Sequence, residues 1–271
     1  METLLFEDTQ IIEEQNRLLE EKNKALTDSL NYAKLIQNAI THKSETLGKA
    51  LPQSFILDIP LDIVSGDFVR VDKKDGKILL ALADCTGHGI PGALMSMVGC
   101  TLLNSVVNCE NKTQSSAVLK TLNNKFKKLT SQATIINDGM DIGFCSINLK
   151  NMELNFAGAH RPLYLIRNNI LTEIKGDNLS IGYITPEEAE FKNHSIKLQK
   201  NDTLYMFSDG YTDQFGGEKG KKFSTKRFKE TLLSIQHLNM DEQEEELKSI
   251  LIQWRKDLAQ VDDICVMGFR I

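Results

Sequence analysis

Residues 77–100 read KILLALADCTGHGIPGALMSMVGC and change character in the middle. An apolar run, Ile78–Ala83, has the length of a buried strand and ends on an acid, Asp84. A glycine-rich turn follows, and from Gly92 the small and apolar residues predict a helix that runs to about Val107. The stretch therefore predicts a buried strand that delivers a carboxylate to a loop without large side chains.

Strand-like runs separated by polar turns surround this stretch. Runs at 54–59 and 67–72 precede it, and six more lie between residues 141 and 209. Helical spacing predicts a second helix at about 115–129, and two further helices precede a last strand at 262–271. Short turns imply antiparallel sheets, and helices in two pairs imply a two-sheet sandwich covered by helices on its outer faces. The predicted fold class is α+β.

The composition is that of a globular chain. Its 271 residues are 41% hydrophobic and 25% charged, which suits one large domain with an appendage or two small domains. The net charge of −5 argues against a nucleic-acid partner, which requires a basic surface. The five cysteines contain no CxxC pair, as expected for reduced thiols. Without a signal-peptide pattern or a run of ~18 apolar residues, we expect a cytoplasmic protein with no direct membrane insertion.

Residues 1–45 differ from the rest, because they contain no glycine or proline and are rich in helix formers. Apolar residues recur every seven positions, which indicates a left-handed coiled coil. Polar residues at the a positions weaken the contact between the two helices but favour a parallel two-helix coiled coil. We therefore expect a homodimer through residues 12–40. The alternative is a single amphipathic helix that lies on its own domain. The d positions are Ile12, Leu19, Leu26, Ala33 and Ile40, and the a positions are Asn16, Asn23, Leu30 and Gln37.

Acidic residues stand at the edges of four strand-like runs. Each has an ordinary explanation alone, because Asp caps helices and opens turns. If the strands lie side by side, however, the carboxylates converge on one edge of the sandwich and repel one another unless a cation joins them. Oxygen ligands without clustered Cys or His select Mg²⁺ or Mn²⁺, and two such ions can activate a shared water for attack on a phosphoryl group. The acids are Asp67, Asp84, Asp209 and the pair Asp262–Asp263.

The glycines of the central stretch have a use on this interpretation. Gly87, Gly89 and Gly92 keep side chains out of the space beside Asp84, so the backbone can approach an ion or a phosphate closely. The helix that starts near Pro91 also directs its positive end toward an anion. A plain strand–turn–helix connection is the alternative interpretation.

Six motifs, in this order, resemble those of the metal-dependent serine/threonine protein phosphatases (PPM), in the bacterial branch typified by the sporulation phosphatase SpoIIE. The resemblance covers roughly residues 50–271, and it implies a four-layer αββα sandwich with two Mn²⁺ or Mg²⁺ ions at one end. The segment before it resembles the helix that links a sensor domain to the phosphatase. The motifs are IVSGDF, ALADCTGHGIPGALMSMVG, DIGFCSINL, NFAGAHRP, YMFSDGYTDQFGG and DDICVMGF.

The resemblance also implies roles for individual residues. Asp67 corresponds to a ligand of one ion, Asp84 to the ligand that bridges both ions, and Cys85 to a ligand through its backbone carbonyl. Asp209 and Asp262 correspond to ligands of the other ion, with Asp263 as a supporting group. The bridging hydroxide would be the nucleophile, rather than a protein side chain.

Several residues depart from the family pattern or have two interpretations. Cys265 stands where the family typically has Thr or Ser, and it is expected to pack in the core. The arginine that holds phosphate in eukaryotic relatives has no clear counterpart; Arg70 is near in sequence but is a weak candidate. Asp141 is a candidate for a third ion. The basic segment 216–229 is either a solvated loop or a docking site for an acidic phosphoprotein. His88 is a proton donor or a loop residue, whereas His160 and Asp213 are expected to be structural.

The sequence therefore predicts a linker helix at residues 1–45 and a phosphatase domain at 46–271. The predicted substrate is phosphoserine or phosphothreonine on a signalling protein, and by resemblance to the branch this is an anti-sigma-factor antagonist, with control exerted through the helix. A catalytically silent dimeric signalling module is the alternative. A two-metal nuclease shares the acids but requires a basic groove, which this acidic chain lacks.

Overall fold

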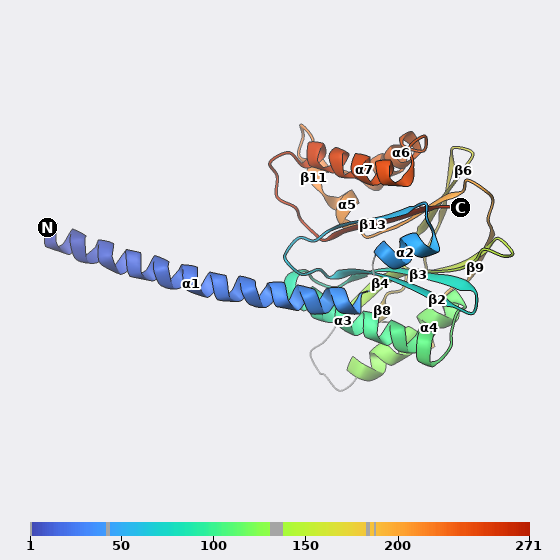
Figure 1. Ribbon diagram of the computed structural model, residues 1–271, viewed down its shortest axis with the longest axis horizontal. Helices are drawn as coiled ribbons and strands as arrows, with labels where there is room; N and C mark the ends of the chain where they lie inside the picture. The colour runs from blue at the N-terminus through green and yellow to red at the C-terminus, as the bar shows by residue number, and fades with distance from the viewer. Residues whose placement is uncertain (1, 42–43, 131–137, 183–184, 187) are drawn as a thin grey trace.

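The computed structural model describes residues 2–41, 44–130, 138–182, 185–186 and 188–271, and it shows two stacked antiparallel sheets between two layers of helices (Figure 1). The predicted four-layer sandwich, preceded by a long N-terminal helix, is thus confirmed. Each helix layer covers one outer face, since successive side chains of the strands in the two sheets point alternately toward the other sheet and toward a helix layer.

The first sheet has five strands and is covered by α6 (Thr225–Ser234) and α7 (Met240–Arg255). Helix α7 begins with a capping box, in which Asn239 and Glu242 exchange hydrogen bonds between side chain and backbone. In sheet order the strands are β1 (Ser54–Ile59), β13 (Ile264–Arg270), β10 (Thr203–Phe207), β6 (Leu163–Arg167) and β7 (Ile170–Ile174).

The second sheet lies on α3 (Gly89–Asn104), its π-helical continuation η1 (Ser105–Cys109) and α4 (Ser115–Thr130). In order its strands are β2 (Asp67–Lys74), β3 (Lys77–Cys85), β4 (Gly139–Asn148), β5 (Glu153–Ala159) and β9 (His194–Lys197), and β8 (Ile181–Gly182) pairs with β4. The short elements are α2 (Ser44–Ala50), α5 (Gly210–Asp213), β11 (Phe215–Gly216) and β12 (Lys221–Lys222).

Strand β3 explains why its sequence is apolar without interruption. Leu80 and Leu82 pack in the core between the sheets, and Leu79 and Ala81 pack in the core under α3 and α4. A strand that is buried on both faces has no polar side, so alternation is absent.

Among the described residues, one helical run, Gly89–Cys109, is long and apolar enough to cross a membrane by length and composition. In the fold this run is α3 with η1, and Cys100, Leu103 and Val106 are fully buried in the core beside the second sheet. Burial against the sheet therefore accounts for part of its hydropathy, since 44% of the apolar window is buried and Ile90 and Leu94 are exposed.

Helix α1 (Glu2–Ile40) extends away from the body of the molecule (Figure 1). The d-position side chains Ile12, Leu19 and Leu26 are 56%, 57% and 54% exposed. Only the last turns meet the body, where Gln37 is buried and Ile40 packs on the core under α3. Docking of the helix on its own domain is therefore confined to its C-terminal end.

Candidate active site

Three of the acids form one row across the second sheet. Asp67 of β2 pairs with Asp84 of β3, and Asp84 pairs with Asp141 of β4. Directly paired residues of antiparallel strands project from the same face of a sheet. Val69 and Leu82, two residues farther along these strands, lie in the core between the sheets, so the acids continue the core-facing row at the end of the sandwich.

The first sheet contributes acids at the same end. Asp209 follows β10, and Asp262 and Asp263 precede β13, which is the neighbour of β10. A cavity of about 500 Å³ opens there, and Asp84, Asp141, Asp209 and Asp262 line it together with His88 and Arg161. The structure thus brings together acids that are far apart in the chain.

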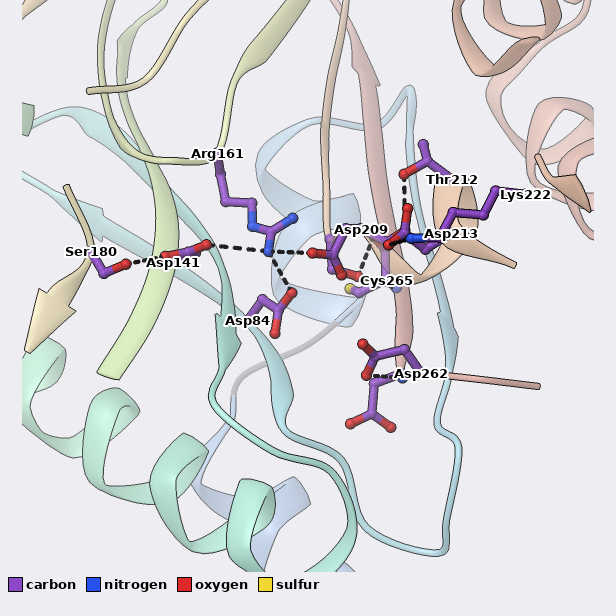
Figure 2. Close-up of polar contacts among 12 residues, drawn as sticks. Asp84, Asp141, Arg161, Ser180, Asp209, Thr212, Asp213, Lys222, Asp262 and Cys265 are labelled. Atoms are coloured by element: carbon purple, nitrogen blue, oxygen red, sulfur yellow. Dashed lines mark hydrogen bonds and ion pairs between the residues drawn. The ribbon is translucent and has the colours of Figure 1, made fainter. Parts of the chain in front are cut away.

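Arg161 lies at the centre of this cluster and was not identified from the sequence. Its Nη2 is 2.8 Å from Asp84 Oδ2, 2.9 Å from Asp209 Oδ2 and 3.4 Å from Asp141 Oδ2. Figure 2 shows the guanidinium between Asp141 and Asp209, with Asp84 close by. The residue belongs to the quoted motif NFAGAHRP, and an arginine between two predicted strands was the only signal in the sequence.

A tight crossing between the sheets places Arg161 there. The chain leaves β5 in one sheet and enters β6 in the other through residues 160–162. His160 has a φ of 55°, and its backbone N–H donates to the carbonyl of Asp177 at 2.8 Å. A Cβ on Gly158 would lie 2.2 Å from the Arg161 carbonyl oxygen, so the crossing requires glycine at that position.

The acids are in an unfavourable electrostatic environment. Burial, followed by repulsion from Asp84, raises the pKa of Asp67 well above its usual value. Burial raises the pKa of Asp84 to about 7, with Arg161 opposing the shift and Asp209, Asp262 and Asp141 adding to it. Burial also raises the pKa of Asp262. One arginine does not compensate these carboxylates, so the cluster has the charge of a cation site.

Two further observations fit a hard cation. Asp67 Oδ2 is buried and accepts no hydrogen bond from the described residues. A Cβ on Gly66 would lie 2.6 Å from the carbonyl oxygen of Gly87 and 3.3 Å from that of Cys85, so glycine alone lets these backbone oxygens approach the acids. The donors are all oxygens, which suits Mg²⁺ or Mn²⁺. In the described ranges, no three Asp, Glu, His or Cys side chains enclose an ion in this conformation, and the guanidinium of Arg161 lies among the carboxylates.

The other acids of the motifs have defined partners. Asp263 is buried and accepts hydrogen bonds from the backbone N–H groups of Leu61 and Gly66 at 2.8 and 2.7 Å, so it fixes the loop that leads into Asp67. Asp213 is on α5 and forms an ion pair with Lys222 at 2.6 Å.

The remaining candidates also have clear positions. The exposed His88 lies 3.6 Å from Asp62, and His160 forms the crossing described above; both line the cavity. Arg70 is buried and binds Asp72 and Asn104, so it supports β2 and α3 rather than the cavity. Cys265 is buried in the core between the sheets, as predicted, and none of the five cysteines forms a disulfide.

A four-layer αββα sandwich with an acid-lined cavity at one end defines the class of the PP2C-type, or PPM, phosphatase domains, and the solved structures of that class match this chain. The SiaA-PP2C domain of Pseudomonas aeruginosa is 31% identical and has a TM-score of 0.84. The match spans 92% of the present chain and 98% of the SiaA chain. The structure of the PP2C phosphatase domain of SpoIIE from Bacillus subtilis, with a fragment of its regulatory domain, is 21% identical and has a TM-score of 0.66. This match spans 81% of the present chain and 63% of the SpoIIE chain, and it shows the fold alone.

The chain belongs to the SpoIIE family, because the family model described as Stage II sporulation protein E matches residues 74–271. A curated relative, the phosphoserine phosphatase RsbU of Bacillus subtilis (strain 168), is 29% identical over 187 residues. The match covers 66% of this chain and 53% of RsbU, so the chain spans about half the length of that relative.

Proposed function

We propose that this chain is a metal-dependent protein phosphatase that hydrolyses phosphoserine or phosphothreonine on a signalling protein. The observation that carries the proposal is the convergence of Asp84 and Asp141 from one sheet with Asp209 and Asp262 from the other at a single cavity, with Asp67 beside Asp84 in the same row. Membership of the SpoIIE family and the likeness to RsbU, which is described as a phosphoserine phosphatase, support it.

The residues that would hold two Mn²⁺ or Mg²⁺ ions are Asp67, Asp84, Asp209 and Asp262, with the backbone carbonyl of Cys85. Bound ions of this kind supply a water of lowered pKa and neutralise charge on a phosphoryl group. Asp84 occupies the middle of the acid row and is the proposed bridging ligand. Asp263 orients the loop before Asp67 and is the second candidate of its pair, and Asp141 stays a candidate for a third ion.

The test of this function is Mn²⁺-dependent phosphate release from an aryl phosphate and from a phosphoserine protein, using the full chain. Titration calorimetry with Mn²⁺ on the same sample separates the alternatives. A folded protein that binds no Mn²⁺ and releases no phosphate at any Mn²⁺ concentration would support the alternative, a catalytically silent signalling module. Faster hydrolysis of DNA or RNA than of phosphoprotein would favour a nuclease.

We further propose that the phosphoprotein docks on a basic surface made by the hairpin β11–β12 and the start of α6, and that the substrate is an anti-sigma-factor antagonist. Lys219, Lys221, Lys226 and Arg227 line this surface beside Trp254, over whose ring the Arg227 guanidinium lies at 4.0 Å. The pair Lys222–Asp213 joins the hairpin to α5, which begins next to Asp209 (Figure 2).

Charge reversal of Lys219, Lys221 and Lys226 to Glu is expected to raise KM for a phosphoprotein about 10-fold. The rate with a small aryl phosphate should not change, because these lysines do not line the acid cavity. Steady-state kinetics with both substrates checks this, and the same triple reversal at the exposed Lys150, Lys175 and Lys200 is the control. Equal effects on the two substrates, or on the two triple variants, would count against docking at the hairpin.

We propose that α1 forms a parallel coiled-coil dimer through its exposed part, since the predicted seam residues Gln37 and Ile40 pack on the body of the same chain instead. We also propose that the helix regulates the site. The buried Gln37 Nε2 donates to the Ser65 carbonyl at 2.6 Å and to Ser96 Oγ at 2.8 Å. Ser65 in turn accepts from the backbone N–H of Asp67 through its Oγ at 3.1 Å. A shift of the helix would therefore be transmitted to Asp67, the first member of the acid row. The division into residues 1–45 and 46–271 and the cytoplasmic location remain predictions.

Substitution of Leu19 and Leu26 by Glu is expected to convert the dimer to a monomer, because it introduces like charges across an apolar seam that is exposed in the single chain. Sedimentation measures the change, and phosphate release on the same samples measures the control that the helix exerts. Lys24→Glu, outside the seam, is the control. A wild-type chain that sediments as a monomer would refute the coiled coil.

A further inference from the structure

Arg161 is held where it meets acids of both sheets at once. Its contacts with Asp84 and Asp141 are to the second sheet, and its contact with Asp209 is to the first. All three contacts use Nη2, which has only two hydrogens and satisfies Asp84 and Asp209 at hydrogen-bond distance. The guanidinium therefore acts as the counter-cation of the cluster.

The guanidinium and a metal ion compete for these carboxylates. Asp84 and Asp209 are the proposed ligands of the ions, and their Oδ2 atoms face Arg161. An ion that binds them would lie close to the guanidinium, and repulsion between the two cations disfavours their presence together.

Displacement from the acids would leave Arg161 inside the cavity. Its backbone is fixed by the crossing at residues 158–161, where the Arg161 N–H donates to the Ala159 carbonyl at 2.6 Å. Arg161 lines the cavity, and its Nε is buried and has no hydrogen-bond partner among the described residues. Such a guanidinium has donors to offer an oxyanion, and a planar fork suits the oxygens of a phosphoryl group.

We propose that Arg161 is the resident counter-cation of the acid cluster, that it competes with the catalytic divalent ions for Asp84 and Asp209, and that it binds the phosphoryl group of the substrate once the ions have displaced it. This inference rests on the proposed phosphatase function. It assigns to one residue both the occupation of the metal-free site and the recognition of phosphate.

The test measures Mn²⁺ affinity by titration calorimetry on the full chain. Arg161→Gln should bind Mn²⁺ at least about 10-fold more tightly than wild type, because the competing cation is gone. In chelator its melting temperature should fall below that of wild type, since the carboxylates lose their counter-cation, and added Mn²⁺ should abolish the difference. Arg161→Lys keeps the charge and should retain the wild-type Mn²⁺ affinity. Unchanged or weaker Mn²⁺ binding by Arg161→Gln would overturn the competition.

The phosphate role has its own readout. Inhibition by inorganic phosphate in saturating Mn²⁺ should weaken about 10-fold in Arg161→Gln and in Arg161→Lys, because both lose the planar fork. Arg167→Gln is the matched control, since Arg167 pairs with Asp202 away from the cavity and should change neither quantity. Wild-type inhibition in both Arg161 variants would overturn phosphate binding. A wild-type chain that binds Mn²⁺ and hydrolyses phosphoprotein would leave the proposed function intact in either case.

Discussion

Asp84→Asn is expected to reduce kcat/KM for phosphate release by about 10³-fold or more, which is the largest effect among the predictions. Asp84 is the middle member of the acid row, next to both Asp67 and Asp141, and it lines the cavity. Asparagine keeps the shape but removes the negative charge that would hold both ions and the activated water. Phosphate release from an aryl phosphate in saturating Mn²⁺ measures the loss.

The metal-free fold should survive this change. The pKa of Asp84 is raised from 3.8 to about 7, so the ionised carboxylate opposes folding increasingly as the pH rises between these values, and the cost is complete above the higher one. At pH 8 the neutral amide removes that cost, and the melting temperature in chelator should be no lower than that of wild type. Stabilisation by Mn²⁺ should disappear, because stabilisation by a ligand requires its binding to the folded state.

Asp213→Asn is the matched control, because Asp213 is an exposed acid on α5 that pairs with Lys222 and does not line the acid cavity. Its activity should stay near the wild-type level. If Asp84→Asn retained more than about a tenth of wild-type activity, or if Asp213→Asn lost as much, the assignment of the acids would be wrong.

Gly92→Ala is the second prediction with a large effect. An added Cβ would lie 2.1 Å from the Gly87 carbonyl oxygen and 3.1 Å from the Cα of Gly66, both of which are backbone atoms. The turn after Asp84 and the segment before Asp67 would have to separate from α3, at a cost of about 1–3 kcal/mol of stability. Because these segments adjoin Asp84 and Asp67, two of the proposed metal ligands, we expect Mn²⁺ affinity and kcat/KM to fall at least about 10-fold.

Gly99→Ala, in the same helix, separates this effect from helix stability in general. Its Cβ would meet side chains rather than backbone: the flexible end of Met140, at 2.9 Å from Cε, and the ring of Phe68, at 3.2 Å from Cε1. We therefore expect a smaller displacement than at Gly92. Denaturant unfolding and Mn²⁺ titration of both variants check the difference. Similar losses of Mn²⁺ affinity in the two variants would contradict a specific role for the turn.

Local patterns were sufficient for the long elements of the fold, but not for the short α2, α5, β8, β11 and β12. The apolar run at residues 78–83 predicted a buried strand, and the structure buries it on both faces, between the other sheet and α3. The turn and helix after Asp84 also follow from glycine and from apolar content. Such signals are readable because strand and helix periods extend over a few neighbouring residues.

The sequence by itself determined the strands, the helix pairs and the acids that end the apolar runs. Only the tertiary structure decided the environment of the acids. It pairs Asp141 with Asp84, and both carboxylate oxygens of Asp263 accept hydrogen bonds from backbone amides. It also places Arg161 between the two sheets, beside Asp84. The physical reason is that strand register and the crossing between sheets join residues far apart in the chain. Electrostatic balance in the cavity depends on those distances, and no local pattern encodes them.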